Sequence, residues 1–406
     1  MFVGTLVPDA PAYRNPALSA AGNRVQAGFV AGLRQAGVDL DRIVSCRPVP
    51  SFPATRRLWV AGERHPWSEG GDIEILPTLN LRAAKYLLWG LLLPVRVIAW
   101  SLRRRGRPRV LLCCNLATPP GLFTYLAARV TGTRLVCILY DVGQLACVYR
   151  RLAYRLWGRI QEATHAALIR RLDGRIVITE AVAADYAPGR HYLLVDGGVE
   201  GAPEPDSAAA ARRDDDDVVF LFAGTLWETN GISLMLAAMR LLPDPRIRLR
   251  IAGDGGLRGE VLAAAAADPR ISYLGRLAPD ALAVAYRQAD ALLNVRLTSG
   301  EHASPYLFPS KLLEYLATGK VVVSTAVAHA RRDYGAICRF LDAATPESLA
   351  AVMAAVAATP AEARRREGAA ARAFMLAHRT WDVQGARVVR YIEEQVLGQG
   401  RNRETR

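Results

Sequence analysis

The chain has 406 residues, 51% of them hydrophobic, so it is too long for one ordinary core and too apolar to be mainly disordered, and two globular domains are expected. Its net charge of +14 comes largely from the first half, because residues 1–200 hold 26 Lys and Arg against 14 Asp and Glu. A basic half suits nucleic acid, anionic lipid or an acidic substrate, but zinc-finger and helix-turn-helix spacings are missing, so no nucleic acid partner is expected.

The first element is an apolar strand over residues 2–7, followed by a loop and a helix over residues 24–36 that ends at Gly37. A strand, a glycine-containing loop and a helix in this order are typical of a Rossmann-like unit. Gly22 and Asn23 directly precede the helix, and asparagine is a preferred N-cap residue. The sequence therefore predicts an α/β first domain whose opening helix is capped by Asn23.

Residues 81–109 form an unusual stretch, which is almost entirely apolar until four closely spaced arginines near its end. Its apolar part is near the lower limit of length for crossing a bilayer, and Pro94 and Arg96 lie in its middle, so a transmembrane helix is not expected. Trp89 and Trp100 on an apolar face, with arginines at one end, are typical of a helix that lies on an anionic membrane surface. The alternative is a core helix with a solvated basic end.

Two buried strands follow, at residues 110–114 and 134–140, and the second of them ends at Asp141. In an open α/β sheet, ligands bind at the carboxyl ends of the strands. Asp141 is therefore a candidate catalytic carboxylate of the first domain. The alternative is that this side chain caps the next helix.

The composition changes to Ala, Pro, Asp and Arg at residues 201–217, which include four consecutive aspartates and are predicted to form a linker. A second domain then begins at residue 218 with another strand, glycine loop and helix. Residues 249–256, LRIAGDGG, form its next strand and turn. Their glycine spacing differs from a dinucleotide fingerprint, so NAD is not expected as a cofactor.

The most informative stretch is residues 304–323, SPYLFPSKLLEYLATGKVVV, which predicts a loop, a helix, a turn and a buried strand. Pro309 suits the start of a helix, and Ser310 is a plausible cap. The free backbone donors of a helix start, with Lys311 beside them, suit phosphate oxygens. Glu314 lies one helical turn further on and could accept hydrogen bonds from two ribose hydroxyls. The alternative is a surface helix with solvated charges.

The six cysteines form no CxxC pair, and most of them lie in apolar runs. They are interpreted as small buried hydrophobic residues of a protein in a reducing compartment, so a cytoplasmic location is expected. The six histidines are scattered without the spacing of metal ligands. No metal site is therefore expected.

The segment FPSKLLEYLATGKVVV resembles the donor-binding segment of the retaining glycosyltransferases of family four, which have the GT-B fold. The resemblance extends upstream to LLNVR, residues 292–296, and is closest to a subgroup with an asparagine, any residue and arginine before FPSK and EY. It implies an α/β protein of two Rossmann-like domains that face each other across a cleft. The expected divisions are residues 1–200 for the acceptor side, 201–217 for the linker, 218–375 for the donor side, and 376–406 for a helix that returns to the first domain with a polar tail.

The resemblance also implies roles for individual residues. Lys311 and Arg296 would be catalytic at the phosphates, and Asp141 would contact the acceptor hydroxyl. The expected donor site consists of Gly22, Asn23, Gly224, Thr225, Gly253, Arg296, Glu301, Ser310, Lys311 and Glu314.

This chain departs from the family at several of those positions. Members usually have arginine and lysine where Thr225 and Asn230 stand, so two cations for a diphosphate are missing. Lys311, Arg296 or backbone N–H groups would have to compensate, because unpaired phosphate charge in a cleft is costly. Many members also carry an acid where this chain has Tyr306, and Glu301 is the candidate replacement.

These features predict an enzyme that transfers a sugar, with retention of configuration, from a UDP- or GDP-linked donor to a hydroxyl of a lipid-linked or cell-envelope saccharide. No cofactor besides the donor substrate is expected. The basic first domain and residues 81–109 place the protein peripherally on the inner face of the cell membrane, with anionic lipid as a partner. The alternatives are an epimerase or phosphorylase of the same fold and, because of Thr225 and Asn230, a non-catalytic partner of a transferase.

Overall fold

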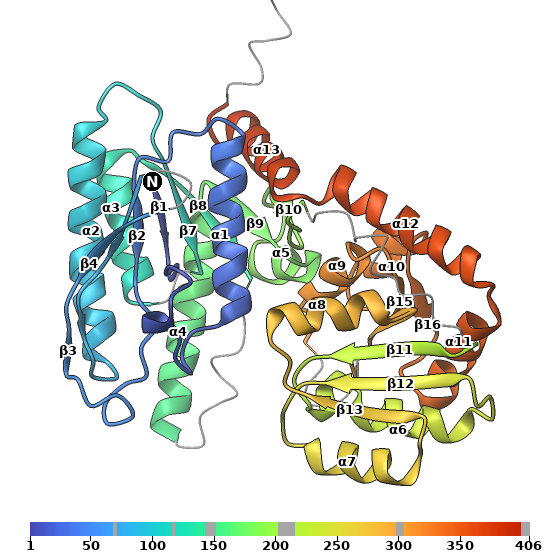
Figure 1. Ribbon diagram of the computed structural model, residues 1–406. Coiled ribbons are helices and arrows are strands. Elements are labelled where there is room, and N and C mark those ends of the chain that lie inside the picture. The colour runs from blue at the N-terminus through green and yellow to red at the C-terminus, as the bar shows by residue number, and fades with distance from the viewer. Residues whose placement is uncertain are drawn as a thin grey trace, which may run out of the picture. The chain divides into compact units, whose positions relative to one another are not determined.

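The computed structural model describes residues 1–67, 71–115, 118–140, 142, 152–201, 216–297 and 304–398. The chain divides into two compact units, each built on a sheet of mainly parallel strands (Figure 1). Unit 1 comprises Met1–Gly198 and Trp381–Arg406, and unit 2 comprises Val199–Thr380.

The sheet of unit 1 has eight strands in the order β10-β9-β8-β7-β1-β2-β5-β4, and all neighbours are parallel except β4 and β5. Its central strands are continuous apolar runs, as expected for a parallel sheet that is buried on both faces. The strands are β1 (Phe2–Gly4), β2 (Ile43–Ser45), β4 (Glu63–Pro66), β5 (Asp72–Ile75), β7 (Val110–Cys114), β8 (Arg134–Leu139), β9 (Gly174–Val177) and β10 (Leu193–Leu194), with a separate pair β3 (Trp59–Val60) and β6 (Thr78–Leu79).

The helices of unit 1 include the last described helical segment of the chain. They are η1 (Pro11–Tyr13), α1 (Ala20–Gln35), α2 (Ala84–Arg103), α3 (Pro120–Thr131), α4 (Leu152–Arg171), α5 (Glu180–Tyr186), α13 (Trp381–Tyr391) and the π-helical turn η4 (Ile392–Val396).

Helix α13 packs closely on α1 through glycines on both helices. A Cβ atom on Gly32 would lie 1.9 Å from the carbonyl oxygen of Trp381, and one on Gly385 would lie 2.1 Å from the carbonyl oxygen of Gly32. The ring of Trp381 lies 5.2 Å from that of Phe29. Side chains at the two glycines would separate the helix backbones, so these positions fix α13 against the first Rossmann-like helix.

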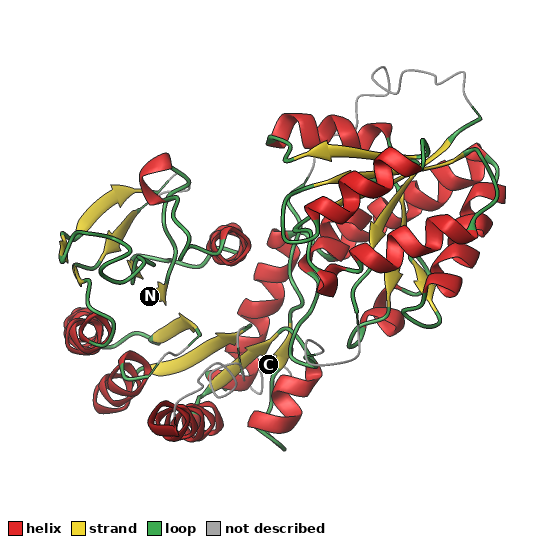
Figure 2. Ribbon diagram, turned by 90° about the horizontal axis from the view of Figure 1, so that it is seen from below, coloured by secondary structure: helices red, strands yellow, loops and turns green. Residues whose placement is uncertain are grey.

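Unit 2 has six parallel strands in the order β13-β12-β11-β14-β15-β16, with helices on both faces of the sheet (Figures 1 and 2). This is the doubly wound order in which the first strand of the unit lies in the middle of the sheet. The strands are β11 (Val218–Ala223), β12 (Ile247–Ala252), β13 (Ile271–Gly275), β14 (Ala291–Asn294), β15 (Val321–Thr325) and β16 (Arg339–Leu341). The helices are η3 (Glu228–Asn230), α6 (Ile232–Leu241), α7 (Arg258–Ala267), α8 (Pro279–Gln288), α9 (Ser310–Leu316), α10 (Ala330–Tyr334), α11 (Pro346–Ala358) and α12 (Ala361–His378).

Helix α2 forms where it is predicted, but its two tryptophans point inward. Trp89 is 6% exposed and donates to the hydroxyl of Thr78, and Trp100 is 7% exposed and donates to the carboxylate of Asp41. The expectation that these tryptophans lie on a membrane-facing surface is therefore wrong. Helix α2 is long and apolar enough to cross a membrane by length and composition alone. Core helices of soluble proteins can have the same length and composition. About a third of the most apolar part of α2 is buried in the unit.

Candidate functional site

The strand order of unit 2 reverses between β11 and β14, and several of the predicted donor residues lie at the carboxyl ends of these two strands. The two strands pair in parallel at Phe220 with Ala291, so their carboxyl ends lie side by side. Gly224 directly follows β11, and Arg296 follows β14 by two residues. In open α/β sheets, such a switch point is where ligands bind.

The glycine turn after β12 lies directly against the end of β11. Gly253 has a φ of +141°, and a Cβ atom there would lie 1.7 Å from the carbonyl oxygen of Gly224. Gly255 has a φ of +159°, and a Cβ atom there would lie 2.6 Å from the carbonyl oxygen of Leu226. Only glycine fits at both places, so the predicted glycine turn brings two strand ends into backbone contact.

Thr225 and Asn230 occupy the positions where cations are usual in the resembling family, and they are bound to each other. The side-chain amide of Asn230 donates to both the hydroxyl and the carbonyl oxygen of Thr225, each at 2.8 Å. Both hydrogen bonds therefore lie within the loop after β11. Neither side chain supplies a positive charge, so the charge for an anion must come from elsewhere at this edge.

Lys311 lies on α9, next to the end of β11. Its Cε atom is 3.6 Å from the place that a Cβ atom on Gly224 would occupy, and its Nζ atom lies 5.7 Å from the ring centroid of Tyr315. The prediction that Ser310 caps this helix is wrong. Pro309 occupies the N-cap position without a side-chain hydrogen bond, and Ser310 is the first helical residue, because the extended backbone of Pro309 ends the preceding loop.

Tyr315 holds α9 to the end of β11. Its buried hydroxyl donates to the carbonyl oxygen of Ala223 at 3.0 Å and accepts from the N–H of the same residue at 3.2 Å. Burial raises the pKa of Tyr315 well above its usual value, and the negative charge of Glu314 acts in the same direction. Glu314 is half-buried, one residue from this anchor and three from Lys311. The position of α9 relative to the strand ends is therefore fixed by hydrogen bonds.

Replacing Tyr315 with Phe should lower the free energy of unfolding by about 1–3 kcal/mol, because two buried backbone groups of Ala223 lose their partner. Urea denaturation measures this loss. Tyr273→Phe is the matched control, since that hydroxyl donates a single hydrogen bond to Gly253 from a half-buried position, and its effect should be smaller. Equal stability of Tyr315→Phe and the wild type would show that this contact does not hold α9.

Arg296 is a half-buried cation at the end of β14. Its backbone N–H donates to the hydroxyl of Thr325 at 3.0 Å. Its guanidinium has no hydrogen-bond acceptor or ion-pair partner among the residues that the structure describes. Burial lowers the pKa of Arg296, and no carboxylate among the described residues offsets that effect. A cation held in this way has the capacity to bind an anionic ligand.

Gly22 and Asn23, two of the site residues predicted in unit 1, lie in the first turn of α1. Ser19, not Asn23, caps this helix: its Oγ accepts from the backbone N–H of Gly22 at 3.0 Å. The side chain of Asn23 instead accepts from the N–H of Val7 and donates to its carbonyl oxygen, both at 2.9 Å. The cap prediction is therefore wrong, because the helix begins earlier and Asn23 ties it to the end of the first strand region. The predicted residues Asp141 and Glu301 lie outside the described residues.

Trp227 is a residue that the sequence reasoning missed. It lies in the loop after β11 and is 55% exposed. A Cβ atom on Gly256 would lie 2.7 Å from its ring, so the indole rests on the glycine turn after β12. The sequence signal for a role at the site was a tryptophan in a glycine-containing loop after a buried strand, since ligands bind at the carboxyl ends of such strands.

Comparison with known proteins gives a family match for unit 2. Residues 217–358 match the family model described as glycosyl transferases group 1. This segment contains the glycine turns, Arg296 and α9. No curated protein matches the chain.

Several solved structures resemble nearly the whole chain at low sequence identity. HepE from Anabaena, solved in complex with UDP, is 13% identical, with a TM-score of 0.63 over 97% of this chain and 98% of its own. Sucrose-phosphate synthase from Thermosynechococcus elongatus is 16% identical, with a TM-score of 0.64 over 98% of this chain and 99% of its own. A glycosyltransferase from Rickettsia africae is 12% identical, with a TM-score of 0.65 over 97% of this chain and 98% of its own.

These likenesses confirm the predicted GT-B fold of two Rossmann-like units. Residues 217–358, the larger part of unit 2, are similar to glycosyl transferases group 1 domains. The prediction of a glycosyltransferase is confirmed at the level of this domain.

Proposed function

We propose that the protein transfers a sugar from a nucleotide diphosphate donor whose diphosphate binds at the edge between β11 and β14. The observation that carries this proposal is Arg296, a half-buried guanidinium at the strand switch point with no acceptor among the described residues. Lys311 stands beside Gly224 at the same edge, on a helix that Tyr315 anchors. Two cations at closely packed strand ends suit the charge of a diphosphate.

Catalysis by this edge would be mainly electrostatic. As the bond between sugar and diphosphate breaks, negative charge grows on the departing phosphate oxygens. Lys311 and Arg296 would stabilise that charge, because Thr225 and Asn230 are neutral and bound to each other. Glu314 would accept hydrogen bonds from the ribose hydroxyls and so orient the donor. Retention of configuration follows from the resemblance to family four.

The donor should be tested first as a UDP-sugar, because structures of HepE hold UDP and UDP-glucose. The experiment incubates the protein with UDP- and GDP-linked sugars and measures release of the nucleoside diphosphate and formation of a glycoside on added acceptors. Release without a glycoside product would favour an epimerase or phosphorylase of the same fold. The tie between Thr225 and Asn230 favours a second candidate, a non-catalytic partner of a transferase, and failure to bind any member of the panel would support it.

We also propose that the acceptor is a lipid-linked or cell-envelope saccharide and that unit 1 binds an anionic membrane surface. The outer face of α2 supports this, although the tryptophans do not. Exposed apolar residues recur every three or four positions along the helix, and α3 continues the face, since its Phe123 lies against Gly90 of α2. This outer face, named here the α2–α3 stripe, consists of Leu87, Leu91, Val95, Ile98, Leu102, Phe123, Leu126 and Val130.

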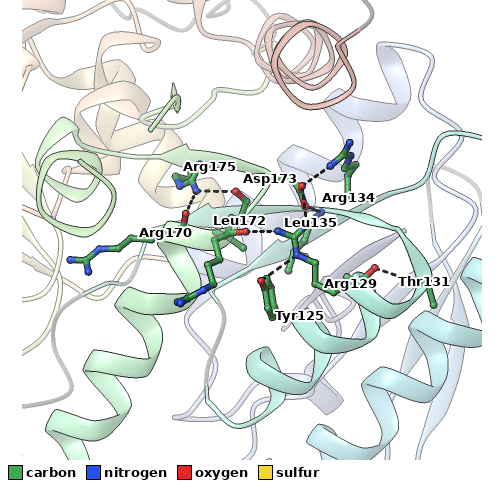
Figure 3. A network of polar contacts seen from close by, with 11 residues as sticks. Tyr125, Arg129, Thr131, Arg134, Leu135, Arg170, Leu172, Asp173 and Arg175 are labelled. Atoms are coloured by element: carbon green, nitrogen blue, oxygen red, sulfur yellow. Dashed lines mark hydrogen bonds and ion pairs between the residues drawn. The ribbon is translucent and has the colours of Figure 1, made fainter. Parts of the chain in front are cut away.

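Arginines gather at the carboxyl ends of the same helices. Arg103 and Arg105 are exposed at the end of α2. Arg129 at the end of α3 and Arg134 at the start of β8 both contact the single carboxylate of Asp173, at 3.5 and 3.1 Å (Figure 3). One acid against two arginines leaves positive charge beside the α2–α3 stripe. An apolar face with a cationic end is suited to anionic headgroups at a bilayer surface.

Leu91→Glu should weaken binding to phosphatidylglycerol vesicles at least tenfold, because it places a charge in the centre of the stripe, where Leu91 is 67% exposed. Sedimentation with vesicles measures the bound fraction. Leu262→Glu is the matched control, since it changes an exposed leucine of unit 2. If the wild type does not sediment with the vesicles, or Leu91→Glu sediments equally well, the stripe is not a membrane-binding surface.

A further inference from the structure

Unit 1 contains a cavity at its own strand switch point. The sheet order β7-β1-β2 reverses direction at β1, as it does at β11 in unit 2. A cavity of about 300 Å³ lies at the carboxyl ends of these strands, lined by Gly4, the last residue of β1, by Cys114, the last residue of β7, and by Asn115, which follows it. Helices α2 and α3 contribute Trp89 and Thr124 to its wall. By the rule for open α/β sheets, this is a second place where a ligand is expected.

The walls of the cavity are mainly apolar. Trp89, Leu93 and Val49 line it, together with the thiols of Cys46 and Cys114. Burial raises the pKa of both thiols, which keeps them protonated and uncharged at neutral pH. Such a surface favours an aliphatic or aromatic group over a sugar, which would lose hydrogen bonds with water. The volume is at the lower end of the range for ligand sites, which suits a short apolar segment.

Thr124 gives the apolar wall one unused polar group. Its side chain is 1% exposed, and its hydroxyl has no hydrogen-bond partner among the described residues. A buried hydroxyl without a partner costs free energy in the empty protein. A ligand that carries an oxygen at this position would remove that cost.

Lys85 is the one cation among the residues described as lining the cavity, and no carboxylate is among them. Its Nζ atom donates to the carbonyl oxygen of Val49 at 3.2 Å, which leaves two N–H donors for other groups. Burial lowers the pKa of Lys85, and the charge of Arg82 acts in the same direction. An anionic group beside the cavity would be attracted by both cations.

We infer that this cavity binds the apolar segment of an amphiphilic acceptor and that Lys85 binds the anionic group of the same molecule. The inference rests on the proposed function, for which it names the acceptor class: an amphiphile with a phosphate-like group next to an aliphatic or aromatic segment. The cavity lies on the inner face of α2, with Trp89 and Leu93. The α2–α3 stripe lies on the outer face, with Leu87 and Leu91, so the two sites are separate.

Octyl phosphate, titrated by calorimetry below its micelle concentration and without nucleotide, tests the inference. Octyl glucoside has the same chain without the charge, and inorganic phosphate has the charge without the chain. Octyl phosphate should bind at least tenfold more tightly than either, because it alone uses both the cavity and Lys85. Lys85→Met should reduce octyl phosphate to the affinity of octyl glucoside.

Two further variants locate the binding. Ala17 is an exposed residue of the lining, so Ala17→Trp should cover the entrance without disturbing the core and abolish binding of both octyl compounds. Leu91→Glu on the outer face should leave both affinities unchanged. Thermal unfolding monitored by circular dichroism shows whether each variant is folded. If Lys85→Met is not folded, Lys85→Arg takes its place, and it should retain most of the preference for phosphate.

Three results would overturn the inference: equal binding of octyl phosphate and octyl glucoside by the wild type, unchanged binding by Ala17→Trp, or loss of binding in Leu91→Glu. The last result would place the amphiphile on the α2–α3 stripe. The failures of the two proposals are distinguishable, because UDP and GDP are each titrated into the same samples. Intact UDP binding without octyl phosphate binding would refute only the cavity assignment, whereas missing nucleotide binding would refute the donor site and the acceptor role that depends on it.

Discussion

Lys311→Met should lower kcat/KM for the nucleotide sugar by at least roughly 100-fold, the effect of removing one group that stabilises charge in a transition state. Lys311 stands beside Gly224 at the end of β11, where no charge comes from Thr225 or Asn230. Methionine keeps most of the length of the side chain and its contact with Tyr315, so the loss reports the charge. Release of nucleoside diphosphate under steady-state conditions measures it.

Lys320→Met is the matched control for that variant. Lys320 lies nine residues further along the chain, and its Nζ atom donates to the carbonyl oxygen of Arg287 at 2.7 Å. This structural contact is away from the strand switch point, so kcat/KM of the folded variant should stay near that of the wild type. Comparable activity of Lys311→Met and the wild type would remove Lys311 from the site.

Arg296→Gln should lower kcat/KM by about 10- to 100-fold, as expected for loss of a charge-assisted contact with phosphate. The same change should leave the Tm unchanged or raise it when nucleotide is absent. The reason is that the half-buried guanidinium has no acceptor among the described residues, so its removal ends a desolvation cost. A structural arginine would behave in the opposite way and lower the Tm.

Arg276→Gln is the control for Arg296. Arg276 directly follows β13 at the edge of the same sheet, and it is exposed. This substitution should change neither kcat/KM nor the Tm. A fall in the Tm of Arg296→Gln, with the activity per folded molecule unchanged, would show that Arg296 serves the fold and not the donor.

The features that the sequence predicted correctly depend on neighbours in the chain. Strand β11, residues 218–223, is a continuous apolar run. Gly253 directly follows the alternating strand β12, where a side chain would meet Gly224. The helix that begins within FPSK, at Ser310, and the strand that follows it were also expected from local signals. Local order of this kind is sufficient to define a Rossmann-like unit, because its connections are short and regular.

The features that were predicted wrongly depend on contacts between distant segments. Helix α2 is apolar on most sides, so periodicity could not decide whether Trp89 and Trp100 or Leu87 and Leu91 would face the core. In the structure the two tryptophans face the core, where their indole N–H groups donate to Thr78 and Asp41 on other segments.

Asn23 shows the same limit at a helix end. Ser19 and Asn23 were both chemically able to cap α1, and the hydrogen bonds of Asn23 to Val7, 16 residues away, follow only from the fold. The roles of Asp141 and Glu301 stay predictions.

The central claim is that unit 2 binds a diphosphate at the edge between β11 and β14, and calorimetry of UDP and GDP against UMP and GMP tests it most directly. At least one diphosphate should bind at least tenfold more tightly than its monophosphate, and Lys311→Met and Arg296→Gln should each remove most of that difference. Failure of both diphosphates to bind, or a preference that survives both substitutions, would contradict the claim.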